Sequence, residues 1–286
     1  NQENLWQYPD WYEDLKKEAK KQELWNLFLP KEYAPWSPGL TNLEIAGLFE
    51  TMSKSAWAQQ IFNCNAPDRG NMEVLAKYGT PEQQKQWLEP LLAGEIRSAY
   101  AMTEPDVASS DATNMELEIR RDGDEYVLNG SKIWTTQAQW ADWIFCLVRT
   151  SKEGKPQEGI SFLIFPMDLP GISVSSLPTL DGPAENQQEI NQVFFEDVRV
   201  KIEDALIGEE NKGWTYAKYL LQFERGNAYA PGLKNALQKT KKLASVEHSG
   251  GEPLLKDPDF QRKIAAMEMK IEALNATELR IFSALS

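Results

Sequence analysis

The spacing of apolar residues changes twice along the chain. Up to about residue 97, apolar positions recur every three or four residues, as in WYEDLKKEAKKQELWNLF, TNLEIAGLFETMSKSAWAQQIF and TPEQQKQWLEPLLAG. This spacing predicts amphipathic helices. From Ser98 to about Leu206 the spacing falls to two residues, which predicts strands. From Gly213 onward the helical spacing returns, in two long segments on either side of SGGEP.

This order predicts an α+β protein with three domains. We expect an N-terminal all-α domain over 1–97, a β domain over 98–206 and a C-terminal helical bundle over 207–286. Clusters of Gly, Pro and Asp separate the strand-like runs, which predicts an antiparallel barrel or sandwich. The runs are MELEIRR, EYVLNGSKIWTT, DWIFCLVRT, GISFLIFPM and QVFFEDVRV. Within the second run, Asn129-Gly130 predicts a tight turn between two strands.

One helix carries explicit start and stop signals. Thr80 is placed as an N-cap, with Pro81 in the first helical position and Gln83 three residues after the cap. Gly94 is placed to end the same helical stretch. We therefore expect the last helices of the N-terminal domain to lie between residues 80 and 94.

Composition excludes several classes of function. A net charge of −13 argues against nucleic acid or an anionic membrane as the main partner. No apolar run reaches the roughly 18 residues of a membrane span, and the chain opens on polar residues instead of a signal-like segment. Cys64, Cys146 and His248 are too few for a disulfide framework or a Cys/His metal cluster, so we expect a reducing compartment. Acid–base chemistry then falls mainly to Asp, Glu, Lys or Tyr.

Two strand ends carry candidate binding groups. In YAMTEPDVASSDATN (100–114), hydroxyls and free backbone N–H groups in a turn suit a phosphate or a polar ring edge. In KIWTTQAQWADW (132–143), a Trp and two Thr at a strand end suit a planar cofactor. Taken alone, an ordinary Ser-rich turn and a core Trp beside strand-forming Thr residues explain these segments better.

The segment LQFERGN (221–227) places an acid and a base in an apolar run. Glu224 shares a helix face with apolar residues, so burial would raise its pKa toward that of a general base. Pro231 cannot donate to the carbonyl of Asn227, so we expect a kink there. The alternative is that Glu224 only pairs with Arg225 or a bundle neighbour. Four lysines that follow form a basic face, for which a solvated helix surface is the stronger interpretation: Lys234, Lys239, Lys241 and Lys242.

Four motifs in this order resemble the acyl-CoA dehydrogenase family. They are YAMTEP…SSD, YVLNGSKIWTT, FFEDVRV…LIGEENKGW and ERGNAYAPG, and LAKYGTPEQQKQWLEPLLAGE is similar to the last N-terminal helices of that family. Each motif alone is weak, but four at the right separations are specific. The resemblance covers most of the chain.

The resemblance implies FAD held between the β domain and the bundle, and α,β-dehydrogenation of an acyl-CoA thioester. A glutamate would take the α proton while the β hydrogen leaves as hydride to flavin N5. Electrons would pass to an electron-transferring flavoprotein. The family also implies a role in fatty acid and lipid metabolism (β-oxidation), a homo- or hetero-oligomer (dimer or tetramer), and a bacterial cytoplasm or an organelle matrix.

The resemblance also assigns roles to single residues. Tyr100, Met102 and Thr103 match positions that line the flavin ring, and Trp134 and Thr136 match the Trp-x-Thr that stacks near it and bonds its edge. Ser110 matches the serine that touches the cofactor or the CoA arm. Ser109 is an added residue relative to the usual Gly-Ser-Asp, so the pair shares this assignment.

The base is expected at Glu224. In isovaleryl- and long-chain-type members the base lies on this earlier helix, directly before an Arg, as in FERG here. Arg225 would lie beside the thioester and tune the carboxylate. The segment from Gly251 onward is most similar to pimeloyl- and sterol-side-chain-type members, in which two non-identical subunits share the work.

Compared with that family, the expected bundle is incomplete. Family chains continue for two or more further helices, so we expect either a fragment or a site completed by another chain. Two alternatives stay open: a flavin oxidase or monooxygenase on the same fold, and a non-catalytic companion subunit of a heteromeric dehydrogenase. A carboxylate at the base position weighs against the monooxygenase.

Overall fold

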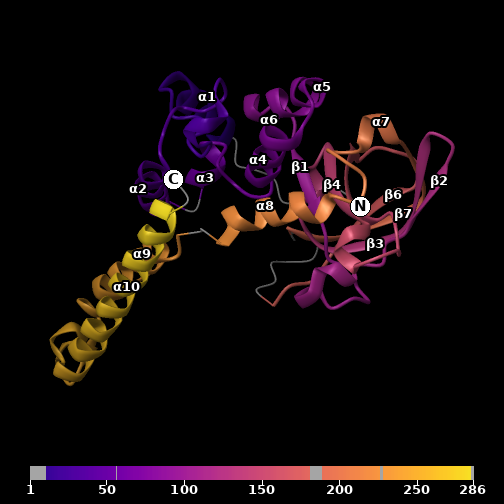
Figure 1. Cartoon of the computed structure of the whole chain (residues 1–286). Coiled ribbons are helices and arrows are strands. Elements are labelled where there is room, and N and C mark those ends of the chain that lie inside the picture. The colour runs from indigo at the N-terminus through magenta and orange to yellow at the C-terminus, as the bar shows by residue number, and fades with distance from the viewer. Residues whose placement is uncertain (1–10, 56, 181–188, 226–227, 285–286) are drawn as a thin grey trace. The chain divides into compact units, whose positions relative to one another are not determined.

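The computed structural model describes residues 11–55, 57–180, 189–225 and 228–284 (Figure 1). The chain divides into two compact units. One comprises 65–222 with the N-terminal residues to Asp14, and the other comprises 15–64 with 223–286. The predicted α+β class is confirmed, with N-terminal helices, a central sheet region and C-terminal helices. The three-domain division at residues 97 and 206 stays a prediction.

The described residues of the first unit form two sheets. The three-stranded sheet has the order β1-β4-β5, from strands Ser98–Ala101, Trp143–Arg149 and Ile160–Pro166. The four-stranded sheet has the order β2-β3-β7-β6, from strands Ile119–Asp122, Glu125–Thr136, Ile190–Lys201 and Ile172–Ser176. Their apolar side chains share one core. All strand pairs are antiparallel except β1 with β4, which is parallel. The long connection through β2 and β3 permits that pairing.

Helices from 68 to 93 cover the three-stranded sheet. They are α4 (Asp68–Tyr78), α5 (Pro81–Gln83), a π-helical turn (Gln84–Leu88) and α6 (Glu89–Ala93). Trp87 is buried with its ring centroid 5.3 Å from that of Trp143 on β4. The Asp68 carboxylate accepts from the Ser98 backbone N–H and hydroxyl, both at 2.7 Å. Because these bonds hold Ser98 on β1, the helices fix the position of the strand that leads to Thr103-Glu104-Pro105, called the TEP segment below.

The predicted helix signals at 80–94 are confirmed. The Thr80 hydroxyl accepts from the Gln83 backbone N–H at 3.2 Å, and the Gln83 side chain accepts from the Thr80 N–H at 3.1 Å. Gly94 closes α6 in the left-handed conformation, with φ of 69°. The polar pattern therefore identified both ends, although it did not predict α4 or the short strand β6.

The turn predicted at Asn129-Gly130 is wrong. β3 runs unbroken through both residues, and the pairing with β7 shifts register between Leu128 and Gly130, which forms a β-bulge. Gly130 has φ of 137°, which explains why glycine occupies the position. The hairpin turn lies instead between the paired residues Asp122 and Glu125, where Gly123 supplies a φ of 66°.

The second unit is helical. It contains α2 (Asn42–Met52), α3 (Ala58–Ile61), α9 (Ala230–Ala244) and α10 (Pro258–Ala284), while α1 (Trp11–Lys21) crosses the boundary between the units. α9 and α10 lie side by side as a helical hairpin (Figure 1). Lys234 pairs with Glu50 and Glu272, at 3.7 and 3.4 Å, and Lys241 pairs with Glu268. These ion pairs support a solvated, internally paired helix face over a phosphate-binding one.

The kink expected near Pro231 is a break between two helices. α8 (Gly213–Arg225) ends before it, and α9 begins at Ala230 with Pro231 in its first turn. The first turn of a helix tolerates proline, because its N–H groups have no partner within the helix.

Candidate functional site

The end of β1 lies against the end of β3. The chain leaves the sheet after Ala101, and the carbonyl of Thr103 accepts a hydrogen bond from the Ile133 backbone N–H at 2.9 Å. Tyr100, Met102 and Thr103 are half-buried along this stretch. The Tyr100 hydroxyl donates to Met102 Sδ at 3.6 Å. The TEP segment therefore lies beside Trp134-Thr135-Thr136 (the WTT segment), although the two are far apart in sequence.

Trp134 occupies a second β-bulge of β3. Lys132 pairs with Val193 and Thr135 with Asn191, so three steps on β3 oppose two on β7 and one residue is extra. Trp134 has φ of 62°, in the left-handed region where a bulky residue is strained, and its side chain is 58% exposed. Strict alternation would send Trp134 inward with Lys132. The bulge turns the indole outward instead, and such features recur next to active sites.

Three threonine hydroxyls surround this bulge. Those of Thr103 and Thr136 are half-buried and make no hydrogen bond within the part of the chain that the structure describes. Thr135 is fully buried, and its Oγ1 also has no hydrogen-bond partner among the described residues. The end of β3 therefore combines an exposed aromatic plane with unused hydroxyl groups, which is the chemistry that a planar, polar-edged ligand requires.

A buried ion pair lies beneath the same segments, and the sequence analysis did not single it out. Lys132 Nζ is 2.7 Å from Glu104 Oε1, with side-chain exposures of 0% and 6%. The sequence carried one signal for this pair. Inward- and outward-facing residues alternate along β3, and Lys132 occupies an inward-facing position. A charged residue at such a position requires a buried partner.

Several predicted residues fall partly outside the described structure. Ser109 and Ser110 begin a 3-10 segment that extends to Asn114, and their side chains are not among those described. Glu224 and Arg225 are the last two residues of α8, and their side chains are likewise outside the described set. Their assignments therefore stay predictions.

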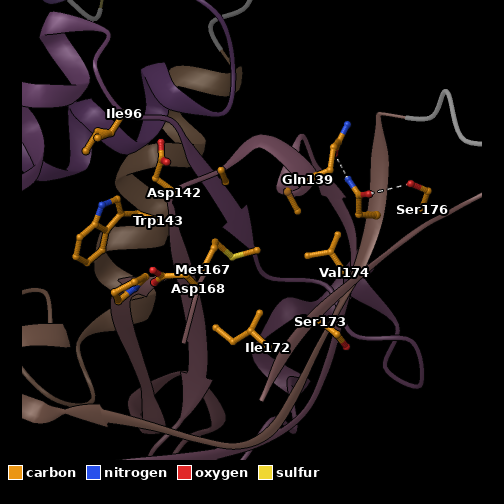
Figure 2. Close-up of a pocket in the computed structure, with 14 residues that line it drawn as sticks. Ile96, Gln139, Asp142, Trp143, Met167, Asp168, Ile172, Ser173, Val174 and Ser176 are labelled. Atoms are coloured by element: carbon orange, nitrogen blue, oxygen red, sulfur yellow. Dashed lines mark hydrogen bonds between the residues drawn. The ribbon is translucent and has the colours of Figure 1, made fainter. Parts of the chain in front are cut away.

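A separate hollow of about 930 Å³ opens beside the start of β4, the end of β5 and β6 (Figure 2). Trp143, Met167 and Ile172 supply apolar walls, and Asp142 and Asp168 supply carboxylates. Of the predicted site residues whose side chains the structure describes, none lines it. Its polar wall at Asn191 is already engaged, because Nδ2 donates to the Thr135 carbonyl at 3.2 Å and to Gln139.

Metal and membrane sites find no support in the described residues. None of the His, Cys, Asp and Glu side chains that the structure describes form a group able to hold a metal ion. Within the same residues, none of the helices has the length and hydropathy needed to span a bilayer.

Sequence comparison assigns most of the chain to one family. Residues 2–95, 99–198 and 211–286 match the N-terminal, middle and C-terminal domains of acyl-CoA dehydrogenases. The chain is 46% identical over 271 residues to acyl-CoA dehydrogenase family member 10 of Mus musculus. That alignment covers 91% of this chain but 25% of the mouse protein. The chain thus spans about a quarter of that relative's length.

Solved structures agree with this assignment. A protein described as an acyl-CoA dehydrogenase from Mycobacterium abscessus is 38% identical, with a TM-score of 0.87, over 98% of this chain and 68% of that chain. The ChsE4–ChsE5 complex from Mycobacterium tuberculosis is 27% identical with a TM-score of 0.79, over 96% and 69% of the two chains. Members of this family are FAD-dependent oxidoreductases. The chain belongs to the acyl-CoA dehydrogenase family.

Proposed function

We propose that this protein dehydrogenates an acyl-CoA thioester between its α and β carbons, using bound FAD and Glu224 as the base. The observation that carries the proposal is the bulge at Trp134. It exposes an indole where family resemblance places the flavin, next to the Thr103 carbonyl contact with Ile133. A strained aromatic residue turned outward from a sheet is a costly arrangement for stability alone.

The residues present fit a flavin. An isoalloxazine ring is planar, with hydrogen-bonding atoms along one edge, and Trp134 offers a plane against which it can stack. Thr103 and Thr136 offer hydroxyls that no described protein group occupies. Tyr100 and Met102 extend the same edge along the end of β1. FAD, when bound, supplies the acceptor for the hydrogen that leaves the β carbon.

Glu224 supplies the other half of the reaction. Its carboxylate takes the proton from the carbon next to the thioester carbonyl, as a general base. Position 224 lies on the same helix stripe as Ala217 and Leu220, both of which are buried. Arg225 then binds at the thioester end, and Ser109 and Ser110 contact the CoA arm or the cofactor.

The protein is further proposed to act as an oligomer and to deliver electrons to an electron-transferring flavoprotein. The hairpin of α9 and α10 supports the oligomer, because it exposes large apolar side chains at Leu243, Val246, Met267 and Met269. Large apolar side chains that are exposed on neighbouring helices are available for association with another subunit. The similarity to the ChsE4–ChsE5 complex supports assembly with a second, different chain.

Absorption spectroscopy of the purified full-length protein tests this function. We expect a yellow protein that releases FAD on denaturation and is bleached anaerobically by some members of an acyl-CoA panel of graded length and branching. The responsive acyl-CoA defines the substrate class. A colourless protein that takes up no added FAD would contradict the proposal and favour a non-catalytic companion subunit.

A further inference from the structure

Lys132 is a buried cation at the centre of the site. It is fully buried on β3, and no other lysine among the described residues is buried. Its Nζ donates to Glu104 Oε1 at 2.7 Å and to the Met102 carbonyl at 3.0 Å. One ammonium group therefore holds the side chain of Glu104 and the backbone carbonyl that directly precedes the TEP segment.

Glu104 extends this linkage to a third segment. Its Oε2 accepts from the Glu116 backbone N–H at 2.6 Å, and its Oε1 accepts from the Leu117 N–H at 2.9 Å. The carboxylate therefore has three donors and is well compensated for its burial. Arg149 fixes the residues just before Glu116, since it donates to the carbonyls of Thr113 and Met115 at 2.6 and 2.9 Å.

Stability alone does not explain this arrangement. Well-packed apolar side chains of similar volume usually stabilise a core as well as a buried ion pair does. The pair does something that apolar groups cannot do, because directional hydrogen bonds set the Met102 carbonyl in one position. Met102 and Thr103 are two residues and one residue before Glu104, and Trp134 is two residues after Lys132. The pair thus links the two segments that are proposed to line the flavin.

We propose that the Lys132–Glu104 ion pair is a positioning device for the flavin. It holds the Met102–Thr103 backbone at a fixed distance from the Trp134 bulge, and its two opposite charges cancel, so the pair adds no net charge to the site. This inference rests on the proposed function. Lys132 and Glu104 act through Met102, Thr103 and Trp134, so they are positioning residues and not catalytic residues.

The test compares three variants by FAD dissociation constant and flavin midpoint potential. Glu104→Gln leaves the ammonium uncompensated, so it should raise the potential, because a positive charge favours the reduced, more negative flavin. Lys132→Met leaves the carboxylate and should lower the potential. Shifts of opposite sign would show that both charges lie close enough to the flavin to act on it, and unchanged potentials would place the pair away from the flavin.

The double variant Lys132→Met with Glu104→Gln carries the test if a single buried charge prevents folding. We expect its flavin-free form to melt within a few degrees of the wild type, while its FAD dissociation constant rises about tenfold or more. The matched control is Lys152→Met with Glu118→Gln, an exposed ion pair of 2.6 Å in the same unit. It should leave both readouts unchanged.

The outcomes separate this inference from the proposed function. If the wild type binds FAD and the double variant binds it with the same affinity and midpoint potential, the positioning role is wrong and the flavin site stands. If the wild type binds no FAD, the proposed function and this inference fall together.

Discussion

Glu278 on α10 caps the first turn of α9 from outside that helix. Its Oε1 accepts from the Tyr229 backbone N–H at 2.8 Å, and its Oε2 accepts from the Ala230 N–H at 3.2 Å. The first N–H groups of a helix have no partner within it, and a carboxylate there also complements the helix dipole. Glu278 therefore fixes the chain a few residues after Glu224.

Removing this cap should destabilise the protein. We expect Glu278→Leu to lower the free energy of unfolding by ~1–3 kcal/mol, because it leaves buried N–H groups without acceptors. Urea denaturation measures the change. Glu278→Gln keeps one acceptor oxygen and should recover part of it. Glu272→Gln on the same helix removes only an exposed pair with Lys234 and should cost ~0–1 kcal/mol. Equal losses for Glu278→Leu and Glu272→Gln would argue against the cap.

Two tryptophans should respond oppositely to truncation. Trp87 is 1% exposed in the core, so Trp87→Ala should cost about 3–5 kcal/mol of stability. Trp134→Ala should leave the melting temperature of the flavin-free protein nearly unchanged, since its indole is 58% exposed. It should weaken FAD binding about two- to tenfold, through lost stacking. A Trp134→Ala protein with unaltered FAD affinity would remove this residue from the site.

Both cysteines should resist thiol reagents in the folded protein. Cys64 and Cys146 are buried and unpaired. Burial raises the pKa of Cys146 to about 12, and the thiolate is the reactive form. Because the pKa of Cys146 is raised, its protonated thiol contributes to the free energy of unfolding. That contribution is complete below the ordinary thiol pKa of about 8.5 and is lost as the pH rises toward 12.

Labelling with a chromogenic disulfide reagent measures this protection. We expect no rapid reaction under native conditions at neutral pH and two equivalents in denaturant. A Cys64→Ala variant isolates Cys146 and should react only as fast as the protein opens. Rapid labelling of that variant at neutral pH would show that the β core is accessible.

The exposed apolar side chains of the α9–α10 hairpin predict self-association or association with a related subunit. Leu243 is 59% exposed, and a charge placed there should weaken the contact. We expect Leu243→Lys to reduce the mass of the assembly that the full-length protein forms, as measured by sedimentation velocity. Gln238→Lys adds the same charge at an exposed polar position of α9 and should not. Identical masses for both variants and the wild type would place the interface elsewhere.

Local rules predicted the parts of the fold that local physics controls. Thr80 and Gln83 form the capping box that the sequence predicted at the start of the helix, because a capping box depends only on residues three apart. Asn129-Gly130 gave the wrong result for the opposite reason. Pairing with β7 on both sides of Gly130 kept β3 continuous, so tertiary contacts converted a turn signal into a bulge.

The candidate site shows the same division. Trp134 and Thr136 were identified through their motif, but the bulge that turns Trp134 outward depends on the register with Val193 and Asn191. Alternation alone would have placed the indole on the inner face. The partnership of Lys132 with Glu104 was also beyond sequence reasoning, since 28 residues separate them.

The central claim is that Glu224 is the base of a flavin-dependent dehydrogenation. The most direct measurement is anaerobic bleaching of the bound flavin by an acyl-CoA that reduces the wild type, repeated with Glu224→Gln and with Glu272→Gln as the matched control. We predict that Glu224→Gln keeps its FAD and its spectrum but is not bleached, because no carboxylate removes the α proton, while Glu272→Gln behaves as the wild type. Full bleaching of Glu224→Gln at the wild-type rate would contradict the account and place the base on another residue.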